Sequence, residues 1–222
     1  MRQENPEADG SPGVVYRGVI EGLYRGRYAP GQRLVEADLT RDFEVGRGSV
    51  REALNRLAAE GLVAMNLHRS AVVRALTRAE ARDIIALLET LNGFSARLAA
   101  ERIASGDSIA RIESAFKTIN DRAVQQDFLR YARARNQFHA AILTTGGNGA
   151  LTRLMPGAGA DLLRVQFRAY ATVEDSVRLD DYRAIYEAIR AGDSRKAEAA
   201  AKLHMRRIGE AVAQLPDAAF AS

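Results

Sequence analysis

Apolar side chains recur at three- and four-residue intervals over the first quarter of the chain, which is the spacing of amphipathic helices. The pattern predicts a helix over residues 14–25, followed by a turn over 28–31 that is built on a Pro-Gly pair. Residues 38–57 then predict a short helix, a tight turn and a second helix. The second helix buries one narrow apolar stripe, which consists of Val50, Ala53, Leu54 and Leu57.

The opposite face of this second helix is polar and cationic, and its first turns combine arginine with small residues. Arginine can bind guanine edges or phosphates with two hydrogen bonds, and small residues let a helix approach a duplex closely. The pattern therefore favours insertion into a DNA major groove, although a surface helix with solvated charges would also show it. The predicted contacts are Arg47, Gly48, Ser49, Arg51 and Asn55.

Two short apolar runs follow, at 62–65 and 71–74, and they predict a small β-hairpin of the kind that forms the wing of a winged helix-turn-helix. His68 and Arg69 lie between the runs, so we expect them to contact DNA from the wing. Arg33 and Arg41 are further candidates for phosphate contacts.

The order and spacing of these motifs resemble the GntR family of bacterial transcription regulators. The matching residues are Pro30-Gly31 with Leu34 and Glu36, then Arg47 to Leu54, then Leu57 with Glu60-Gly61-Leu62-Val63. The resemblance implies a winged helix that binds double-stranded DNA.

The chain departs from the family pattern at two places. Relatives commonly have Ser or Thr where Gly46 stands, and Thr-Pro or Thr-Thr where Gly48-Ser49 stand. Their wing usually carries Arg-Gly where this chain has Arg69-Ser70. The first change removes hydroxyl groups that would reach phosphate, and the second places a Cβ in a turn that often uses glycine.

From Thr77 onward the sequence predicts helices almost throughout. Thr77 and Glu80 form a capping box that opens a helix reaching to about residue 104. No segment alternates with period two for long enough to predict a sheet, so we expect an antiparallel all-α bundle. The further predicted helices cover residues 108–125, 127–143, 150–155, 159–170, 174–191 and 194–215.

The expected fold is mainly α, with an N-terminal winged helix-turn-helix and a C-terminal helical bundle. At 222 residues the chain is long enough for two domains. The predicted ranges are a disordered lead over 1–11, a DNA-binding domain over 12–76, an effector-binding and dimerisation domain over 77–215, and a tail over 216–222.

The helical half resembles the ligand-sensing FCD domain of the FadR subfamily. The matching residues are Phe138-His139 with the helix end at Gly147-Asn148, then Asp180-Asp181-Tyr182 with Ile185, Ala188, Ile189 and Gly192-Asp193, then Ala197 through His204-Met205. The resemblance implies a small-molecule effector. Many relatives also hold a divalent metal, zinc or nickel, through one Asp and three His.

In this chain only His139 and His204 match that metal-binding pattern. Arg135 stands where the Asp is expected, one turn before His139, and Tyr182 stands near the position of another His. A guanidinium repels a dication, so we expect no tightly bound metal and no other cofactor. If a metal were retained, His139 and His204 would be its ligands, and the protein would be a metal-dependent organic-acid sensor.

We expect instead a metal-free pocket for a small anionic metabolite, formed by Arg135, His139, Tyr182 and His204. An arginine can hold a carboxylate with two parallel hydrogen bonds. The alternative is that Arg135 projects to solvent or pairs with an acid, and that both histidines are satisfied core residues.

Composition narrows the classes of function. The chain has no cysteine, which excludes disulfides and thiolate chemistry and fits the cytoplasm. No apolar run is long enough for a transmembrane helix. The three histidines are scattered and no nucleophile motif or phosphate-binding loop occurs, so an enzyme is not expected. A helical module for protein contacts is a third class, which the arginines of the second helix argue against. We therefore expect a homodimeric regulator that binds a near-palindromic operator.

Overall fold

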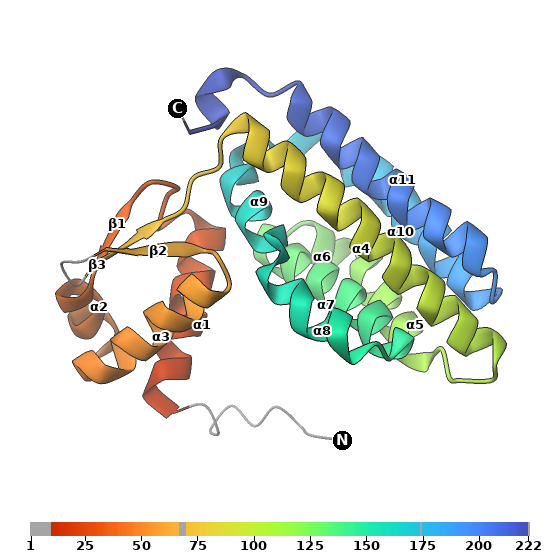
Figure 1. Cartoon of the computed structure of the whole chain (residues 1–222), viewed down its shortest axis with the longest axis horizontal. Coiled ribbons are helices and arrows are strands. Elements are labelled where there is room, and N and C mark those ends of the chain that lie inside the picture. The colour runs from red at the N-terminus through yellow and green to blue at the C-terminus, as the bar shows by residue number, and fades with distance from the viewer. Residues whose placement is uncertain (1–9, 67–69, 174, 222) are drawn as a thin grey trace. The chain divides into compact units, whose positions relative to one another are not determined.

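The computed structural model describes residues 10–66, 70–173 and 175–221, which form two compact units. The first unit contains residues 10–66 and 70–77 together with two later segments, 159–168 and 218–221. The second unit contains 78–158, 169–173 and 175–217. Figure 1 shows helices in both units and strands only in the first. Residues 159–168 were expected in the helical domain, so the first unit includes a segment that lies far outside the predicted range 12–76.

The first unit is built on three helices, α1 (Gly10–Arg25), α2 (Glu36–Phe43) and α3 (Arg47–Ala59). α1 begins at Gly10, so the last two residues of the expected lead are helical; residues 1–9 lie outside the described residues. α2 ends at Phe43 and is capped by Glu44, which has a left-handed backbone (φ 53°) and whose N–H donates to the carbonyl oxygens of Thr40 and Arg41. The predicted apolar stripe of α3 is confirmed, because Val50, Ala53, Leu54 and Leu57 are all buried.

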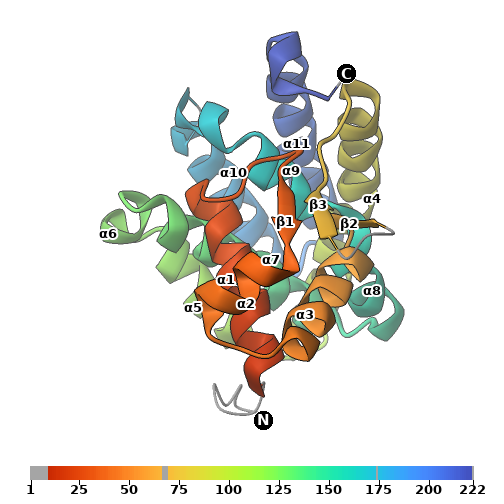
Figure 2. The ribbon, with the colours of Figure 1, turned by 90° about the vertical axis from the view of Figure 1, so that its left-hand side faces the viewer.

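A three-stranded antiparallel sheet completes the winged helix (Figure 2). The predicted hairpin is formed by β2 (Val63–Asn66) and β3 (Ser70–Val73), in which Met65 lies opposite Ala71. β1 (Arg33–Val35) pairs with the other edge of β3, so that Leu34 also lies opposite Ala71. The sequence did not predict β1, because three residues are too few to establish an alternating pattern.

A helix from much later in the chain, α9 (Ala160–Gln166), belongs to the same unit. Its Leu162, Leu163 and Val165 are buried. The sequence predicted helix over 159–170, whereas the structure ends α9 at Gln166 and continues as the 3₁₀ helix η2 (Arg168–Val173).

The second unit is an all-α bundle, as predicted. α4 packs along α11, and α10 packs against both of these helices. Phe138, Ile112 and Ile189 lie at the fully buried centre of the bundle. The helices are α4 (Arg78–Ala104), α5 (Ala110–Ile119), α6 (Arg122–Gln125), α7 (Phe128–Gly146), α8 (Gly149–Leu154), α10 (Asp175–Arg190) and α11 (Ser194–Ala213), with the 3₁₀ helices η1 (Met155–Ala158) and η3 (Asp217–Ala219).

The single helix predicted over 108–125 is wrong. The structure breaks it after Ile119, and Asp121 begins α6 by accepting a hydrogen bond from the Ala123 N–H at 2.8 Å. Aspartate competes with the helical backbone for such hydrogen bonds, which is why it prefers the first position of a helix to the interior.

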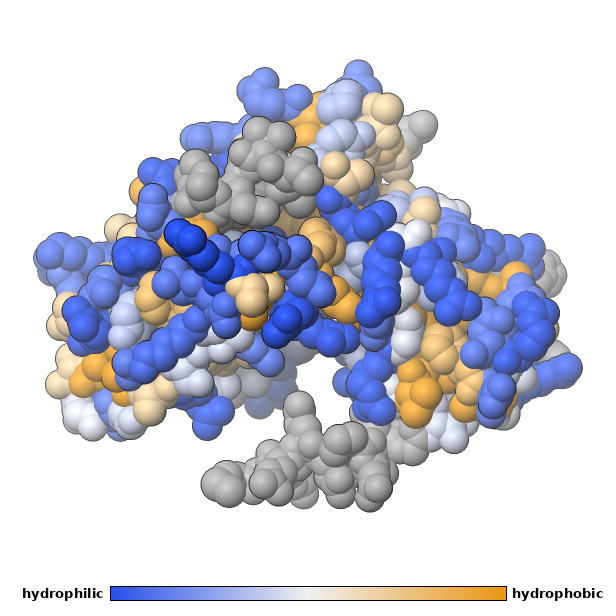
Figure 3. Space-filling model, turned by 180° about the vertical axis from the view of Figure 1, so that it is seen from behind, coloured by the Kyte–Doolittle hydropathy of each residue, from blue (hydrophilic) through white to orange (hydrophobic). Residues whose placement is uncertain are grey.

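The face of the molecule drawn in Figure 3 is largely hydrophilic, with separate hydrophobic areas. Charged residues make up 27% of the chain, and most of their side chains face outward. None of the helices in the described part of the chain is long and apolar enough to cross a bilayer.

Candidate functional site

The candidate nucleic-acid interface is the polar face of α3. The buried apolar stripe packs α3 against the rest of the first unit, so the polar face opposite the stripe points outward. Arg47, Gly48, Arg51 and Asn55 are exposed, and Ser49 is half-buried. The ideal Cβ positions of Gly46 and Gly48 meet nothing within 4 Å, so the start of the helix is open to a close approach. The side chains predicted to contact DNA therefore share one accessible face, and their contacts stay a prediction.

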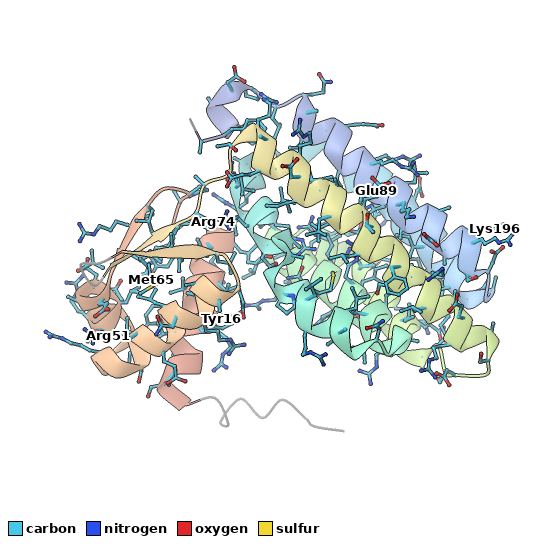
Figure 4. All side chains as sticks on the ribbon, in the orientation of Figure 1. Tyr16, Arg51, Met65, Arg74, Glu89 and Lys196 are labelled. Carbon is cyan, nitrogen blue, oxygen red and sulfur yellow. The ribbon has the colours of Figure 1, made fainter. Side chains whose placement is uncertain are left out.

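Arg51 is held by a carboxylate that the sequence reasoning did not connect with it. Its Nε lies 3.1 Å from each carboxylate oxygen of Glu36, at the start of α2. The Glu36 side chain is only 10% exposed, whereas that of Arg51, which is labelled in Figure 4, is 46% exposed. Glu36 thus holds one edge of the guanidinium while almost half of the side chain remains accessible. Glu36 therefore restricts the orientation of the Arg51 guanidinium.

The candidates for DNA contact that lie outside α3 differ in their surroundings. Arg33 is exposed on β1, at the edge of the sheet. Arg41 is 72% exposed, but its guanidinium lies 3.0 Å from Asp38 and 3.6 Å from Asp42. These two acids weaken the attraction of Arg41 for phosphate. His68 and Arg69 lie outside the described residues.

The far end of α3 is fixed by an aromatic contact. The guanidinium of Arg56 stacks 3.8 Å from the ring centroid of Tyr16, which is labelled in Figure 4, and the Tyr16 hydroxyl donates a 2.6 Å hydrogen bond to Glu60. Burial, followed by the Glu60 carboxylate, raises the pKa of Tyr16, which stays protonated and keeps donating this bond. The contact ties α3 to α1 at the end that is remote from Arg47.

The second candidate site lies in the bundle, where three of the four predicted effector-binding side chains meet. The ring of Tyr182 on α10 lies 4.8 Å from that of His204 on α11 and 5.9 Å from that of His139 on α7. The two imidazole centroids are 6.0 Å apart. These three rings, which we call the ring cluster, come from the consecutive helices α10 and α11 and from α7, which lies earlier in the chain.

Arg135, the fourth predicted residue, lies one helical turn before His139 and is only 7% exposed. Its guanidinium carbon lies 5.0 Å from the ring centroid of Tyr131. Among the described residues no carboxylate forms an ion pair with Arg135, and its buried Nε has no hydrogen-bond partner. Arg135 therefore neither projects to solvent nor pairs with a described acid, and a buried cation of this kind is costly unless an anion joins it.

Asp181 and Arg207 extend the ring cluster and were missed by sequence reasoning. His204 Nδ1 lies 3.3 Å from one carboxylate oxygen of Asp181, and Arg207 donates to the other. Burial raises the pKa of Asp181, but the hydrogen bond and charge of His204 together with Arg207 outweigh burial and lower that pKa. Asp181 thus stays ionised and orients the His204 ring.

The lowered pKa of Asp181 predicts a pH-dependent contribution to stability. Such stabilisation is present above the ordinary pKa of aspartate and disappears as the pH falls through the lowered value. Asp181→Asn is expected to cost about 1–3 kcal/mol of unfolding free energy near neutral pH and less near pH 3, which is below the ordinary pKa of aspartate, so that the stabilisation is already declining there. Urea unfolding at the two pH values measures this difference. Asp83→Asn, at an exposed aspartate, is the control, and an equal cost of Asp181→Asn at both values would contradict the prediction.

The residues present do not fit the metal site that the family resemblance implies. Two of its four positions carry Arg135 and Tyr182, neither of which is an expected ligand there. In residues 10–66, 70–173 and 175–221 no group of three or more His, Cys, Asp or Glu side chains is placed to hold a metal ion. The absence of a bound metal stays a prediction.

The fold and the exposed cationic helix define a DNA-binding transcription regulator of the winged-helix class, and comparison with known proteins identifies its family. Residues 13–73 match the family model "Bacterial regulatory proteins, gntR family", and residues 83–207 match the FCD domain. The chain belongs to the GntR family and carries an FCD domain. It is a regulator and not an enzyme.

Curated relatives support this assignment over most of the chain. The Escherichia coli galactonate operon transcriptional repressor is 30% identical over 81% of this chain and 86% of its own length. The probable D-xylose utilization operon transcriptional repressor of Paenarthrobacter nicotinovorans is 24% identical over 84% of this chain and 82% of its own.

Solved structures show the same fold. E. coli McbR/YncC superposes with a TM-score of 0.77 at 17% identity, covering 92% of this chain and 98% of that one. A GntR regulator from Rhodococcus sp. RHA1 gives a TM-score of 0.76 at 21% identity, again covering 92% and 98%. At these identities the likeness concerns the fold alone.

Proposed function

We propose that this regulator acts in the cytoplasm as a homodimer, and that each subunit places α3 in the major groove of a near-palindromic operator. A two-fold symmetric protein matches a site whose two halves are related by the same symmetry. The exposed Arg47 and Arg51 supply the contacts in each half-site. Light scattering of the free protein and of its operator complex tests the dimer, and a monomer in both would contradict it.

We propose further that a small carboxylate metabolite, bound beside Arg135 in the bundle, controls DNA binding. The observation that supports this is the burial of Arg135 without an acidic partner among the described residues. A carboxylate would supply the missing charge through two parallel hydrogen bonds. Tyr182, His139 and His204 would add polar contacts from the ring cluster.

The names of the relatives agree with this class of ligand only in part. The E. coli relative is named for a galactonate operon, and galactonate is a carboxylate. The Paenarthrobacter relative is named for D-xylose utilization, and D-xylose is a neutral sugar. The chemistry of Arg135, not the names, therefore carries the proposal.

Thermal-shift measurements with a panel of hydroxy acids, sugar acids and dicarboxylates test the effector site. At a hundredfold excess over Kd, a bound acid should stabilise the wild-type protein by about 2.7 kcal/mol. Arg135→Met should melt at a higher temperature than the wild type without ligand, because it removes a buried charge, and it should lose the response to the acid.

Arg130→Met is the matched control, because Arg130 is an exposed arginine on the same helix. Equal stabilisation of Arg135→Met and wild type by the same acid would contradict the proposal. Elemental analysis of the purified wild-type protein completes the test, since one zinc or nickel per chain would support the metal-dependent sensor instead.

A further inference from the structure

Gln166, at the end of α9, makes an unusual set of hydrogen bonds within the DNA-binding unit. The side chain is buried, and its Oε1 accepts a 2.5 Å hydrogen bond from the Leu76 backbone N–H. Its Nε2 donates to the Leu76 carbonyl at 2.8 Å and to the Ala219 carbonyl at 3.0 Å. One primary amide thus satisfies both backbone groups of Leu76, in the way that a neighbouring strand would.

Leu76 lies one residue before Thr77, where the N-terminal part of this unit ends. It follows the last strand, β3, by three residues and precedes the first residue of α4 by two. Its side chain is completely buried. Holding Leu76 therefore fixes the end of the segment that connects the wing to the helical unit.

The C-terminal segment contributes to the same arrangement. The Ala221 N–H donates a 2.9 Å hydrogen bond to the Leu76 carbonyl. The rings of Phe167 and Phe220 meet edge to face with their centroids 5.3 Å apart. We call Leu76, Gln166, Phe167 and residues 219–221 the linker clamp.

α9 is also fixed to the helix that packs against α3. The Tyr24 hydroxyl of α1 donates a 2.5 Å hydrogen bond to Asp161, which also accepts one from Arg164 at 3.0 Å. Along the chain, α9 is preceded and followed by residues of the helical unit, which end at Ala158 and resume at Ala169. The DNA-binding unit is thus joined to the helical unit at four points of the chain and not only at the linker after Thr77.

We propose that Gln166 is a positioning residue for operator binding, which it supports by holding Leu76 in the linker clamp. The inference rests on the homodimer proposed above, because only a linked pair of recognition helices gains affinity from a restricted spacing. Loosening the clamp increases the conformational freedom of each DNA-binding unit in the free dimer. Binding to the operator removes this freedom at a cost in free energy, so the affinity falls. Gln166 touches no DNA in this scheme and acts through the backbone of Leu76.

The test compares full-length Gln166→Met with the wild type. Methionine has a similar length but neither accepts from the Leu76 N–H nor donates to the two carbonyl groups. The Kd is measured for the duplex that the wild-type protein enriches from random-sequence DNA, well below the melting temperature of each protein. We expect a 2- to 30-fold higher Kd, roughly the range found for positions that modulate coupling between sites. Faster hydrogen exchange at the Leu76 and Ala221 amides should accompany it.

Gln137→Met is the matched control, because Gln137 is an exposed glutamine on α7. If Gln166→Met does not fold, Phe220→Ala loosens the same clamp from the tail and should raise the Kd in the same direction. A lower melting temperature with a Kd within twofold of the wild type would mean that Gln166 only stabilises the fold, and would overturn the inference. A wild-type protein that is monomeric on DNA would overturn both the homodimer and this inference, whereas a dimeric wild type with an unaffected variant would overturn the inference alone.

Discussion

Replacing Arg47 and Arg51 together with methionine should raise the Kd for the operator by about 30-fold or more. An arginine that binds a base edge with two hydrogen bonds contributes about 1–3 kcal/mol, so the pair accounts for roughly 2–6 kcal/mol. Both side chains are exposed on the open face of α3, and both lie outside the stripe that holds this helix in place. The fold should therefore survive the change, which circular dichroism and the melting temperature would verify.

The salt dependence of binding separates the two kinds of contact that these arginines can make. Each lost phosphate contact lowers the slope of log K against log salt by about one, whereas a lost base contact weakens binding to the preferred sequence and leaves the slope almost unchanged. The single variants should show which of the two residues makes which contact. Because they lie one turn apart on the same helix, their effects need not be additive.

A charge-matched control is available in the helical unit. Arg111→Met with Arg195→Met also removes two exposed arginines and leaves α3 intact. This variant should bind within a few-fold of the wild type. If the Arg47/Arg51 variant bound as tightly as this control, α3 would not be the DNA-reading element.

Glu36 can be tested in the same way, because its carboxylate accepts hydrogen bonds from Arg51 Nε. Glu36→Gln keeps the size of the side chain but removes the charge that holds Arg51 Nε. Loss of this orientation should weaken base discrimination more than total affinity, because phosphates accept an arginine from many directions whereas a guanine edge does not. Glu36→Gln and Arg51→Met are therefore expected to affect the recognition of sequence in the same direction.

Local patterns predicted the helices well because the residues that define them are near neighbours in sequence. The stripe of α3 depends on positions three and four apart, and Leu57 is buried as that spacing requires. The break between α5 and α6 had a visible indication in Asn120-Asp121, which the longer periodic pattern outweighed. No such indication existed for β1, because its pairing with β3 joins residues almost forty positions apart.

The sites show the same division between local and distant information. The exposed face of α3 followed from its own sequence, whereas the Glu36–Arg51 pair depends on the packing of α2 against α3. In the bundle, family resemblance brought His139, Tyr182 and His204 together correctly. It gave no functional reason to select Asp181 or Gln166, whose contacts join residues 23 and 90 positions apart in sequence.

Phe138→Ala should cause the largest loss of stability in the helical unit, about 3–5 kcal/mol. The Phe138 side chain is completely buried, and its ring meets Tyr182 edge to face at 5.5 Å and Phe116 at 6.2 Å. Deleting the ring leaves a cavity that the surrounding helices cannot close without moving. For a unit of this size each kcal/mol lowers the melting temperature by roughly 2–4 °C, so calorimetry should show a fall of about 6–20 °C.

The same substitution links the core to the proposed effector site. Phe138 precedes His139 and packs on Tyr182, so its loss removes the support behind two members of the ring cluster. Phe138→Ala should therefore lose part of the stabilisation by an organic acid that the wild type shows, whereas Phe94→Ala, at a partly exposed phenylalanine of α4, should keep all of it. A Phe138→Ala protein that melts at the wild-type temperature would mean that the bundle core does not depend on this ring. One that melts lower but responds fully to the acid would place the effector away from the ring cluster.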